Sequence, residues 1–425
     1  MATILFILFI SMMALGVPIF ISLALGSIGA LQITGQFDFV IGVHRLVSGI
    51  DSYVQLAIPF FILAGGIMNS GSITKRLFRL AKAISNPIPG NLGHANVVAS
   101  IIFAGKTGSA VADAGGVGQI CTEAMIDDGY DPDFSAAITA SSSIIGPITP
   151  PSIPLVVFGA MAEVSIGALF LAGIVPGAMI GISLMILIYI FSVRRNYPKG
   201  KFNLWELLVS YKGAFLSLLA PLIIMIGMFT GFITPTEAAA VAVVYAFVLS
   251  FILYRDITWK KLYKTILDAS VSTATITIIL GAAAAFSWII AIEGIPQALT
   301  GQLLAITTNP WVILLLLNIT LLIIGMFMEA LSLLTILVPF LVPILMHTTI
   351  DPVHMGIVVV LNLMIGLVTP PAGICLFVVS KYKGVSLERL YKEILPFLIP
   401  LIIVLFIVTY FPQLVLWLPG LIFGR

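Results

Sequence analysis

The sequence predicts an all-helical protein that crosses a membrane several times. Hydrophobic residues make up 60% of the 425 positions and charged residues only 9%, against roughly 45–50% and about 25% in a soluble protein. Apolar stretches long enough to span a bilayer recur from one end of the chain to the other, and basic residues gather in a few short loops between them. No segment is polar enough to form a separate soluble domain.

A bilayer core about 30 Å thick takes roughly 20 apolar residues per helix. The first apolar stretch lacks a basic segment in front and is too long for the core of a signal peptide, so it is interpreted as a membrane helix. Two further regions, 92–160 and 325–380, are apolar but interrupted by Gly, Pro, Ser and Thr. Continuous spans are predicted at about 4–31, 53–70, 165–193, 213–233, 236–253, 269–292, 309–327 and 393–418.

Seventeen of the twenty basic residues lie in four loops between these stretches. By the positive-inside rule these loops face the cytoplasm, and we expect the N-terminus to be cytoplasmic as well. The loops are partly amphipathic, which predicts short helices at the membrane surface. Spans 53–70 and 269–292 would then run in opposite directions, as in an inverted repeat. The basic residues are Lys75, Arg76, Arg79 and Lys82; Arg194, Arg195, Lys199, Lys201 and Lys212; Arg255, Lys260, Lys261 and Lys264; and Lys381, Lys383, Arg389 and Lys392.

The chain matches itself when it is shifted by 220 residues. DPDFSAAITASSSIIGPITPP at 131–151 falls on DPVHMGIVVVLNLMIGLVTPP at 351–371 without a gap. Asp followed by Pro is a preferred helix start, so Asp131 and Asp351 are expected to cap helices. The Gly-x-x-Thr-Pro-Pro motif that follows should break each helix, because two prolines remove two backbone donors. Broken helices are therefore predicted at about 133–160 and 353–380.

Each broken helix is preceded by an apolar segment that is too interrupted for a simple span. The first, at about 92–126, has two short arms around a small polar tip at 105–109, and the second, at about 323–348, places 325–329 at its tip or in its first arm. We predict that both are re-entrant hairpins. The two inverted repeats would be residues 1–212, ending in a cytoplasmic linker at 194–212, and residues 213–425, beginning with a connecting helix.

The helix breaks indicate a transport site. Carbonyl groups freed at a break cannot face lipid and are tolerated only where protein or a polar cavity satisfies them. Interrupted helices at matching positions of two inverted halves point to the substrate and cation sites of a transporter, with helix N-termini suited to anions and C-terminal carbonyls suited to Na⁺. The alternative is a pair of proline kinks that relieve packing.

Five single residues each allow two interpretations. Glu329 is an ionisable group in an apolar segment, which is costly and normally functional, although a structural hydrogen bond would also explain it. Asp113 either caps or closes the first hairpin or binds an ion. Lys106 either meets an anionic substrate or extends toward the membrane surface. Ser142 and Asn362 occupy matching positions of the repeat near the breaks, but Ser and Asn also join membrane helices.

Composition disfavours other function classes. A formal charge of +2 leaves no broad basic surface for nucleic acid. Two cysteines and four histidines share no metal-ligand spacing, so we expect no metal centre and no cofactor. GKT at 105–107 is not a phosphate loop, because position 100 is serine. An intramembrane hydrolase would need paired aspartates at membrane depth or a histidine beside a serine, and we do not expect an enzyme.

The motifs together are similar to a known family. FAGKTGSAVADAGGVG, GPITPPSIPLVVFGAM, GFITPTEAAAVAVVYA, GMFMEALSLLTILVPFLVPI and GLVTPPAGICLF resemble, in order and spacing, the large membrane subunit of tripartite ATP-independent periplasmic (TRAP) transporters. The resemblance implies a multi-pass protein of the bacterial inner membrane that moves like an elevator and works with a small membrane subunit and a periplasmic substrate-binding protein. It also implies Na⁺-driven import of an organic acid, such as sialic acid or a C4-dicarboxylate. Because no four-helix segment precedes residue 1, we expect the small subunit to be a separate chain.

Carried over to matching positions, the resemblance places the hairpin tips at 107–109 and near 325–330, and the breaks at 146–151 and 366–371. Lys106 departs from the family, which usually has an apolar residue there. A stand-alone sodium/organic-anion symporter is the alternative, because its hairpins and broken helices would look alike. The expected substrate-binding residues are Lys106, Thr107, Ser109, Ser142 and Glu329, and the expected Na⁺-binding residues are Thr107, Gly108, Ser109, Gly146, Thr149, Gly325, Asn362, Gly366 and Thr369.

Overall fold

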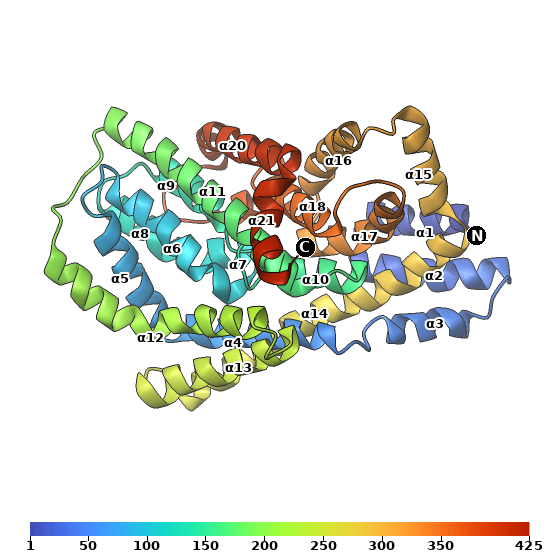
Figure 1. Cartoon of the computed structure of the whole chain (residues 1–425), viewed down its shortest axis with the longest axis horizontal. Coiled ribbons are helices and arrows are strands. Elements are labelled where there is room, and N and C mark those ends of the chain that lie inside the picture. The colour runs from blue at the N-terminus through green and yellow to red at the C-terminus, as the bar shows by residue number, and fades with distance from the viewer. Residues whose placement is uncertain (425) are drawn as a thin grey trace.

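The computed structural model describes residues 1–424, and the side chains of all of these except 103–107. Helices form most of this part of the chain, and none of its residues lies in a strand (Figure 1). The all-α architecture predicted from composition is confirmed. The helices are α1 (Ala2–Ala14), α2 (Ile19–Thr34), α3 (Phe39–Ser48), η1 (Val54–Leu56), α4 (Ala57–Ser70), α5 (Ile73–Ser85), α6 (Asn91–Thr107), α7 (Ala110–Asp113), η2 (Ala114–Gly118), α8 (Gln119–Asp127), α9 (Pro132–Ser143), α10 (Ile153–Ala162), α11 (Ile166–Arg194), α12 (Leu204–Phe229), α13 (Pro235–Phe247), η3 (Val248–Leu253), α14 (Trp259–Ile292), α15 (Ile295–Ile306), α16 (Pro310–Gly325), α17 (Ala330–Met346), α18 (Pro352–Gly366), α19 (Ile374–Val379), α20 (Leu387–Tyr410) and α21 (Pro412–Phe423).

Among the described residues, five helices are long and apolar enough to cross a membrane: α11, α12, α13 together with η3, α14 and α20. Two bent pairs, α4 with α5 and α15 with α16, meet the same criterion when each pair is taken together. The helices α11 to α14 match the spans predicted at 165–193, 213–233, 236–253 and 269–292. Long apolar segments without a turn signal were therefore predicted well.

Two predicted spans are wrong because each contains a sharp turn. The span expected at 4–31 is two helices, α1 and α2, which pack against each other. Gly16 takes the left-handed φ of 79° and Pro18 follows it, so the helix cannot continue. The span expected at 393–418 ends with α20 at Tyr410, and Pro412 starts α21. Average hydrophobicity does not detect a turn inside an apolar stretch.

The N-terminus lies beside the C-terminal end of α14. The amino group of Met1 is 3.4 Å from Oε2 of Glu293, which directly follows α14. The first turn of α14 carries Lys260 and Lys261, and the 34-residue helix is roughly 51 Å long. The N-terminus and this basic loop are therefore at opposite ends of the molecule. The side of the membrane on which each of them lies stays a prediction.

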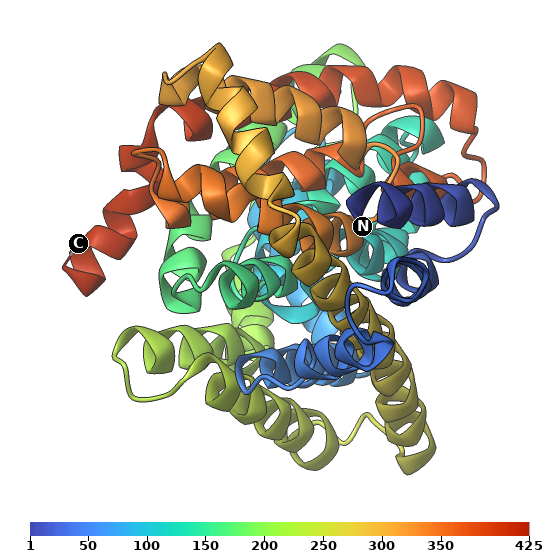
Figure 2. The ribbon, with the colours of Figure 1, turned by 90° about the vertical axis from the view of Figure 1, so that its right-hand side faces the viewer.

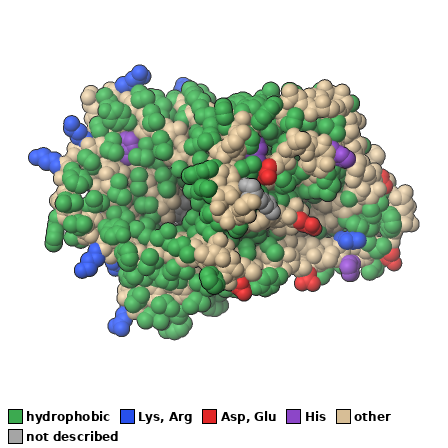
Figure 3. All heavy atoms as spheres, viewed as in Figure 1, with side chains coloured by type: hydrophobic (Ala, Val, Ile, Leu, Met, Phe, Trp, Pro, Cys, Tyr) green, Lys and Arg blue, Asp and Glu red, His purple; other side chains and the backbone are tan. Residues whose placement is uncertain are grey.

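The basic side chains gather at one end of the molecule. Figure 3 shows Lys and Arg mostly at the end where Figure 1 places α5 and the start of α12, with most Asp and Glu nearer the other end. Of the four amphipathic basic segments, only α5 is a separate helix, bent by 73° from α4 after the extended residue Gly71. The other three are continuous with α12, α14 and α20, so the expectation of four separate surface helices is wrong.

The two Asp-Pro motifs start helices as predicted. Asp131 Oδ1 accepts hydrogen bonds from two backbone N–H groups at 2.9 and 3.0 Å, and Asp351 Oδ1 accepts two at 2.8 and 3.2 Å. α9 then ends at Ser143 and α18 at Gly366, and turns lead on to α10 and α19. Both helices are broken where the Gly-x-x-Thr-Pro-Pro motifs lie.

Parts of the chain that are far apart in sequence are joined around these broken helices. α9 and α18 both pack against α11 and α20. Figure 2 shows the orange and red helices in the upper part of the molecule and the yellow-green helices below them. Asp133, in the first turn of α9, is 2% exposed and accepts a 2.7 Å hydrogen bond from the Ser386 N–H. Its other oxygen lies 2.9 Å from Arg389 Nε. The Tyr391 hydroxyl donates to the carbonyl of Pro371 in the second break at 2.5 Å.

Asp133→Ala should lower the free energy of unfolding by about 1–3 kcal/mol, because the Ser386 N–H loses its acceptor inside the protein. Unfolding of purified protein in mixed micelles measures this change. Arg389→Gln is the matched variant and should cost less, since the Arg389 side chain is 63% exposed and an exposed ion pair contributes little. Equal stability of wild type and Asp133→Ala would contradict the assignment.

Candidate functional site

The first hairpin turns at Gly108 and Ser109. α6 continues through 107, so positions 105–107, which were expected in the tip, belong to the end of a helix. Gly108 has the left-handed φ of 57°, and Ser109 Oγ accepts a 3.4 Å hydrogen bond from an N–H of α7. A Cβ on Gly108 would lie 2.8 Å from the backbone nitrogen of Ile153, so the tip touches the start of α10. The side chains of Lys106 and Thr107 lie outside the described residues.

The second hairpin turns at 326–329, and its first arm is α16. The hairpin was expected at 323–348, but its first arm already begins at Pro310. The apolar run at 309–327, predicted as an independent span, is that arm. Glu329 caps α17, and its Oε2 accepts hydrogen bonds from the Ser332 N–H at 2.9 Å and from the Ser332 hydroxyl at 3.2 Å. The structural role considered for Glu329 is thus present, and the same side chain lines the cavities described below.

Glycines let each hairpin approach its helix break closely. A Cβ on Gly366, at the end of α18, would come within 2.6 Å of the carbonyl carbon of Gly325, at the end of α16. In the first half, a Cβ on Gly146 would lie 2.1 Å from Oδ2 of Asp113 on the returning arm. A side chain at Gly366 would push hairpin and break apart, whereas one at Gly146 would displace the carboxylate of Asp113. Three residues predicted for the cation sites, Gly146, Gly325 and Gly366, therefore lie where hairpin and break meet.

The two threonines of the breaks have the same hydrogen bond. Thr149 Oγ1 donates to the carbonyl of Ile145, and Thr369 Oγ1 donates to the carbonyl of Ile365 at 2.7 Å. Each hydroxyl proton is thus bound to the preceding helical turn, and each oxygen keeps lone pairs that can accept. An oxygen with available lone pairs at a helix C-terminus is a suitable ligand for a hard cation.

Both tips and both breaks meet at one small cavity. Its volume is about 20 Å³, which is enough for roughly one water-sized particle. Gly108, Ser109 and Glu329 line it, so three predicted site residues from different hairpins are brought together. The remaining lining residues are Ala110, Val111, Pro147, Pro154, Ala330, Leu331, Met364 and Leu367.

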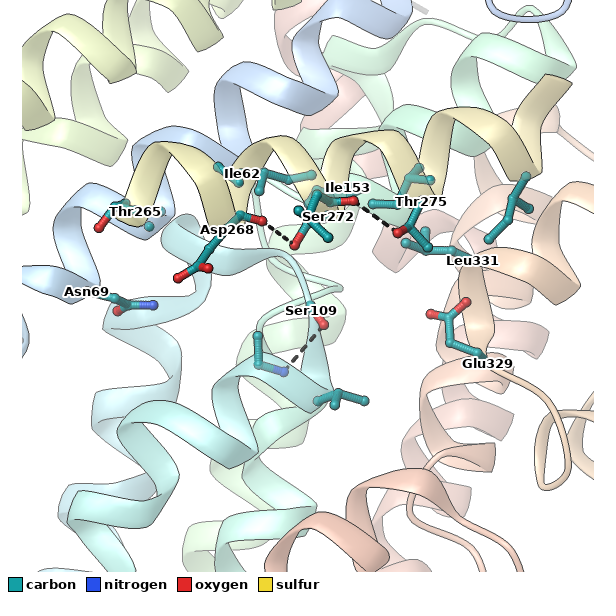
Figure 4. A pocket seen from close by; sticks show the side chains of 18 of the residues that line it. Ile62, Asn69, Ser109, Ile153, Thr265, Asp268, Ser272, Thr275, Glu329 and Leu331 are labelled. Carbon is teal, nitrogen blue, oxygen red and sulfur yellow. Dashed lines mark hydrogen bonds between the residues drawn. The ribbon is translucent and has the colours of Figure 1, made fainter. Parts of the chain in front are cut away.

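A larger cavity of about 730 Å³ lies next to the tips. Ser109 and Glu329 line it on the hairpin side, together with the starts of α10 and α19 at Ile153 and Ile374. The opposite wall is formed by α4 and α14. Figure 4 shows Ser109 between Asp268 of α14 and Glu329, with Asn69 of α4 beyond Asp268. The cavity is within the size range of about 300–1,000 Å³ that is typical of small-molecule sites.

Ser142 and Asn362 do not line these cavities, and neither do Gly146, Thr149, Gly325, Gly366 and Thr369. Ser142 is fully buried, and its hydroxyl is 3.4 Å from Asn96 Oδ1 on α6 and donates to the Thr139 carbonyl at 3.2 Å. Asn362 is also fully buried, and its amide nitrogen donates to Asn318 Oδ1 on α16 at 2.7 Å. Each residue joins a broken helix to the first arm of its hairpin. Neither lines the cavities described above.

Sequence reasoning missed the wall formed by α14. Thr265, Asp268, Ser272 and Thr275 line the large cavity, and their spacing of three or four residues places them on one helix face. The predicted span started at 269, directly after Asp268, so this carboxylate was counted with the neighbouring loop. The helical spacing of four polar residues in an apolar helix was the available signal.

The fold defines a class of membrane transporter. Over 91% of this chain and 88% of the other, the structure matches the YdaH transporter of Alcanivorax borkumensis with a TM-score of 0.62 and 16% identity. MtrF of Neisseria gonorrhoeae also gives a TM-score of 0.62, with 14% identity over 86% of this chain and 83% of its own. At these identities the likeness concerns the fold, which is that of a polytopic all-α transporter.

Sequence comparison then gives the family. Residues 6–414 match the model of the tripartite ATP-independent periplasmic transporter, DctM component. The chain is 44% identical to the sialic acid TRAP transporter large permease protein SiaM of Vibrio cholerae over 412 residues, 96% of both chains. It is 40% identical to the C4-dicarboxylate TRAP transporter large permease protein DctM of Pseudomonas aeruginosa over 377 residues, 88% of both. The chain belongs to the DctM family of TRAP transporter permeases, and it is a transporter and not an enzyme.

Gly366→Ala should destabilise the protein by about 1–3 kcal/mol, because the added methyl group collides with the backbone of Gly325 in a packed core. The apparent melting temperature in detergent should therefore fall. Gly301→Ala on α15 is the control, since a Cβ there meets nothing within 4 Å and should leave stability unchanged or slightly higher. Equal melting temperatures for wild type and Gly366→Ala would refute the close contact.

Proposed function

We propose that this chain is the transport subunit of a TRAP system that imports a carboxylate-bearing solute across the bacterial inner membrane, driven by a Na⁺ gradient. The observation that carries the proposal is the convergence of both hairpin tips and both helix breaks on one small cavity beside a larger one. Relatives at 44% and 40% identity bear the names of sialic acid and C4-dicarboxylate transporters, which supports an organic acid as substrate. No catalytic step is required.

The proposed Na⁺ sites lie at the two breaks. There the hydroxyl oxygens of Thr149 and Thr369 lie beside the carbonyls of Ile145, just after α9, and of Ile365, in the last turn of α18, and Na⁺ prefers such oxygen ligands. The two environments are related by the 220-residue repeat, which supports one site in each half. Glu329 and Asp113 would add negative charge near these sites and so favour cations.

The proposed substrate site is the larger cavity. Ser109 and the N-terminus of α10 would meet the substrate carboxylate, since helix N-termini favour anions. Lys106 and Thr107 precede Ser109 closely in the sequence, and we propose that Lys106 adds a positive charge for the anion. Ser142 is not carried into this site, because it is buried between α6 and α9.

Two inverted repeats that move as an elevator would account for the duplicated architecture. The pairing of Ser142 with Asn96 in one half and of Asn362 with Asn318 in the other supports this division at about residue 212. A small membrane subunit and a periplasmic binding protein are the proposed partners. The relative SiaT of Haemophilus influenzae is 38% identical over 411 residues, and it is the longer protein, because the match covers 96% of this chain and 67% of SiaT.

The orientation that we propose follows from the basic loops. With those loops in the cytoplasm, the N-terminus faces the periplasm, because Met1 and Glu293 lie at the opposite end of α14 from Lys260 and Lys261. This replaces the cytoplasmic N-terminus expected from the sequence.

Uptake of radiolabelled sialic acid and succinate into liposomes, with cognate partners and an imposed Na⁺ gradient, tests the proposed function. Thr149→Val and Thr369→Val should each raise the Na⁺ concentration for half-maximal uptake about three- to tenfold, since each removes one oxygen ligand. Thr320→Val is the matched control, because Thr320 donates to the Leu316 carbonyl in the same way on an exposed face. Uptake without any Na⁺ dependence would refute Na⁺ coupling. Full uptake without the binding protein would favour a stand-alone symporter.

The proposed orientation is tested by cysteine labelling after Cys121 and Cys375 are replaced by alanine. Ala2→Cys should react with a membrane-impermeant thiol reagent in spheroplasts, whereas Lys199→Cys and Lys383→Cys should react only after the membrane is permeabilised. The reason is that Ala2 lies beside Glu293, away from the basic end. The opposite pattern of labelling would invert the topology.

A further inference from the structure

We infer that the α14 wall of the large cavity selects hydroxyl-rich monocarboxylates over dicarboxylates, and that Asp268 is the residue that makes this selection. The inference rests on the proposed function, because it concerns which organic acid the cavity accepts. The evidence is the hydrogen-bonding character of the wall that faces the hairpin tips.

The α14 wall presents acceptors to the cavity. Ser272 Oγ donates to the Asp268 carbonyl and Thr275 Oγ1 donates to the Val271 carbonyl, both at 2.9 Å (Figure 4). Thr265 Oγ1 donates in the same way to the Lys261 carbonyl at 3.0 Å, but it also shares a 2.7 Å hydrogen bond with the Ser70 hydroxyl. Because the hydroxyl protons of Ser272 and Thr275 are bound to the helix backbone, what these two residues offer a ligand is lone pairs. A ligand on this wall must supply donors.

Asp268 adds a carboxylate to this wall. Its side chain is exposed, and among the described residues nothing donates a hydrogen bond to its carboxylate or forms an ion pair with it. An ionised carboxylate has two acceptor oxygens and no donor. It repels a second anion that lies close to it, and it favours hydroxyl, amide or ammonium groups.

The opposite side of the cavity is also rich in acceptors. Glu329 is a second carboxylate, although its Oε2 is occupied by the amide and hydroxyl of Ser332. No residue in the described lining of this cavity carries a positive charge. The substrate carboxylate can be placed at Ser109 and the start of α10, because a helix N-terminus favours an anion.

The number of carboxylates on the substrate then decides the fit. An acid with one carboxylate can turn it toward the hairpin tip and direct hydroxyl or amide groups toward Asp268, Ser272 and Thr275. A diacid brings a second negative charge into a cavity whose described lining already holds two carboxylates, Asp268 and Glu329, and it has fewer groups that can donate to them. The three α14 residues extend over about 10 Å along the helix, which suits a chain of several hydroxyl groups.

Binding to the purified chain with its cognate small subunit tests this inference, because the periplasmic binding protein would otherwise impose its own selectivity. Isothermal titration in Na⁺ buffer with N-acetylneuraminate, D-gluconate and succinate measures the affinities. In wild type the two hydroxylated acids should bind at least about tenfold more tightly than succinate, and Asp268→Asn should reduce this ratio about tenfold or more, by strengthening succinate binding and weakening that of the hydroxylated acids.

Asp51→Asn is the matched control, since it removes the same charge at an exposed position that does not line the cavity, and it should leave the ratio unchanged. Melting temperatures show whether each variant is folded. Tighter binding of succinate than of the hydroxylated acids by wild type, or an unchanged ratio in folded Asp268→Asn, would overturn the inference while leaving organic-acid transport intact. Failure of all three acids to bind would overturn the proposed substrate class, and the inference with it.

Discussion

The structure depends on one constraint: backbone groups released by a helix break cannot be left in hydrocarbon. The Gly-x-x-Thr-Pro-Pro motifs make two such breaks, and the rest of the fold encloses them. Each break is covered by the hairpin that precedes it, with a glycine contact at Gly146 or at Gly366. α11 and α20 then pack against both broken helices. The centre of the molecule therefore contains polar backbone within an apolar protein.

The same enclosure explains why polar side chains occur where they do. The hydroxyl groups of Thr149 and Thr369 donate to the carbonyls of Ile145 and Ile365, so each satisfies one carbonyl group beside a break. Asn96 and Asn318 hold the first hairpin arms to the broken helices through amide hydrogen bonds. The polar side chains of Asn96, Ser142, Asn318 and Asn362 thus link half-helices, whereas those of Ser109, Asp268 and Glu329 line the large cavity.

The parts of the fold that follow from local chemistry were predictable, whereas the parts that follow from chain packing were not. Asp131 and Asp351 could be assigned as caps because an Asp-Pro pair starts a helix through hydrogen bonds to the next few residues alone. The turn at Gly16 and the long first arm ending at Gly325 were missed, because hydrophobicity was averaged across them. Asp268 was missed for another reason. Only the packing of α14 against α4 and the hairpin tips gives its face a cavity to line.

The contact between Gly325 and Gly366 makes the two arms of the second hairpin unequal. At Gly325 and Gly366, α16 and α18 are too close for an added methyl group, and the hydrogen bond between Asn318 and Asn362 joins the same two helices. The position of α16 relative to α18 is therefore fixed. α17 packs mainly on α10, α14 and α15, and it contains Pro339 and Pro343, where a helix bends most easily. If the second hairpin acts as a gate, α17 is the arm that moves, and it bends at the two prolines. Glu329, which caps the N-terminal end of α17, would then leave the cavity whenever the gate opens.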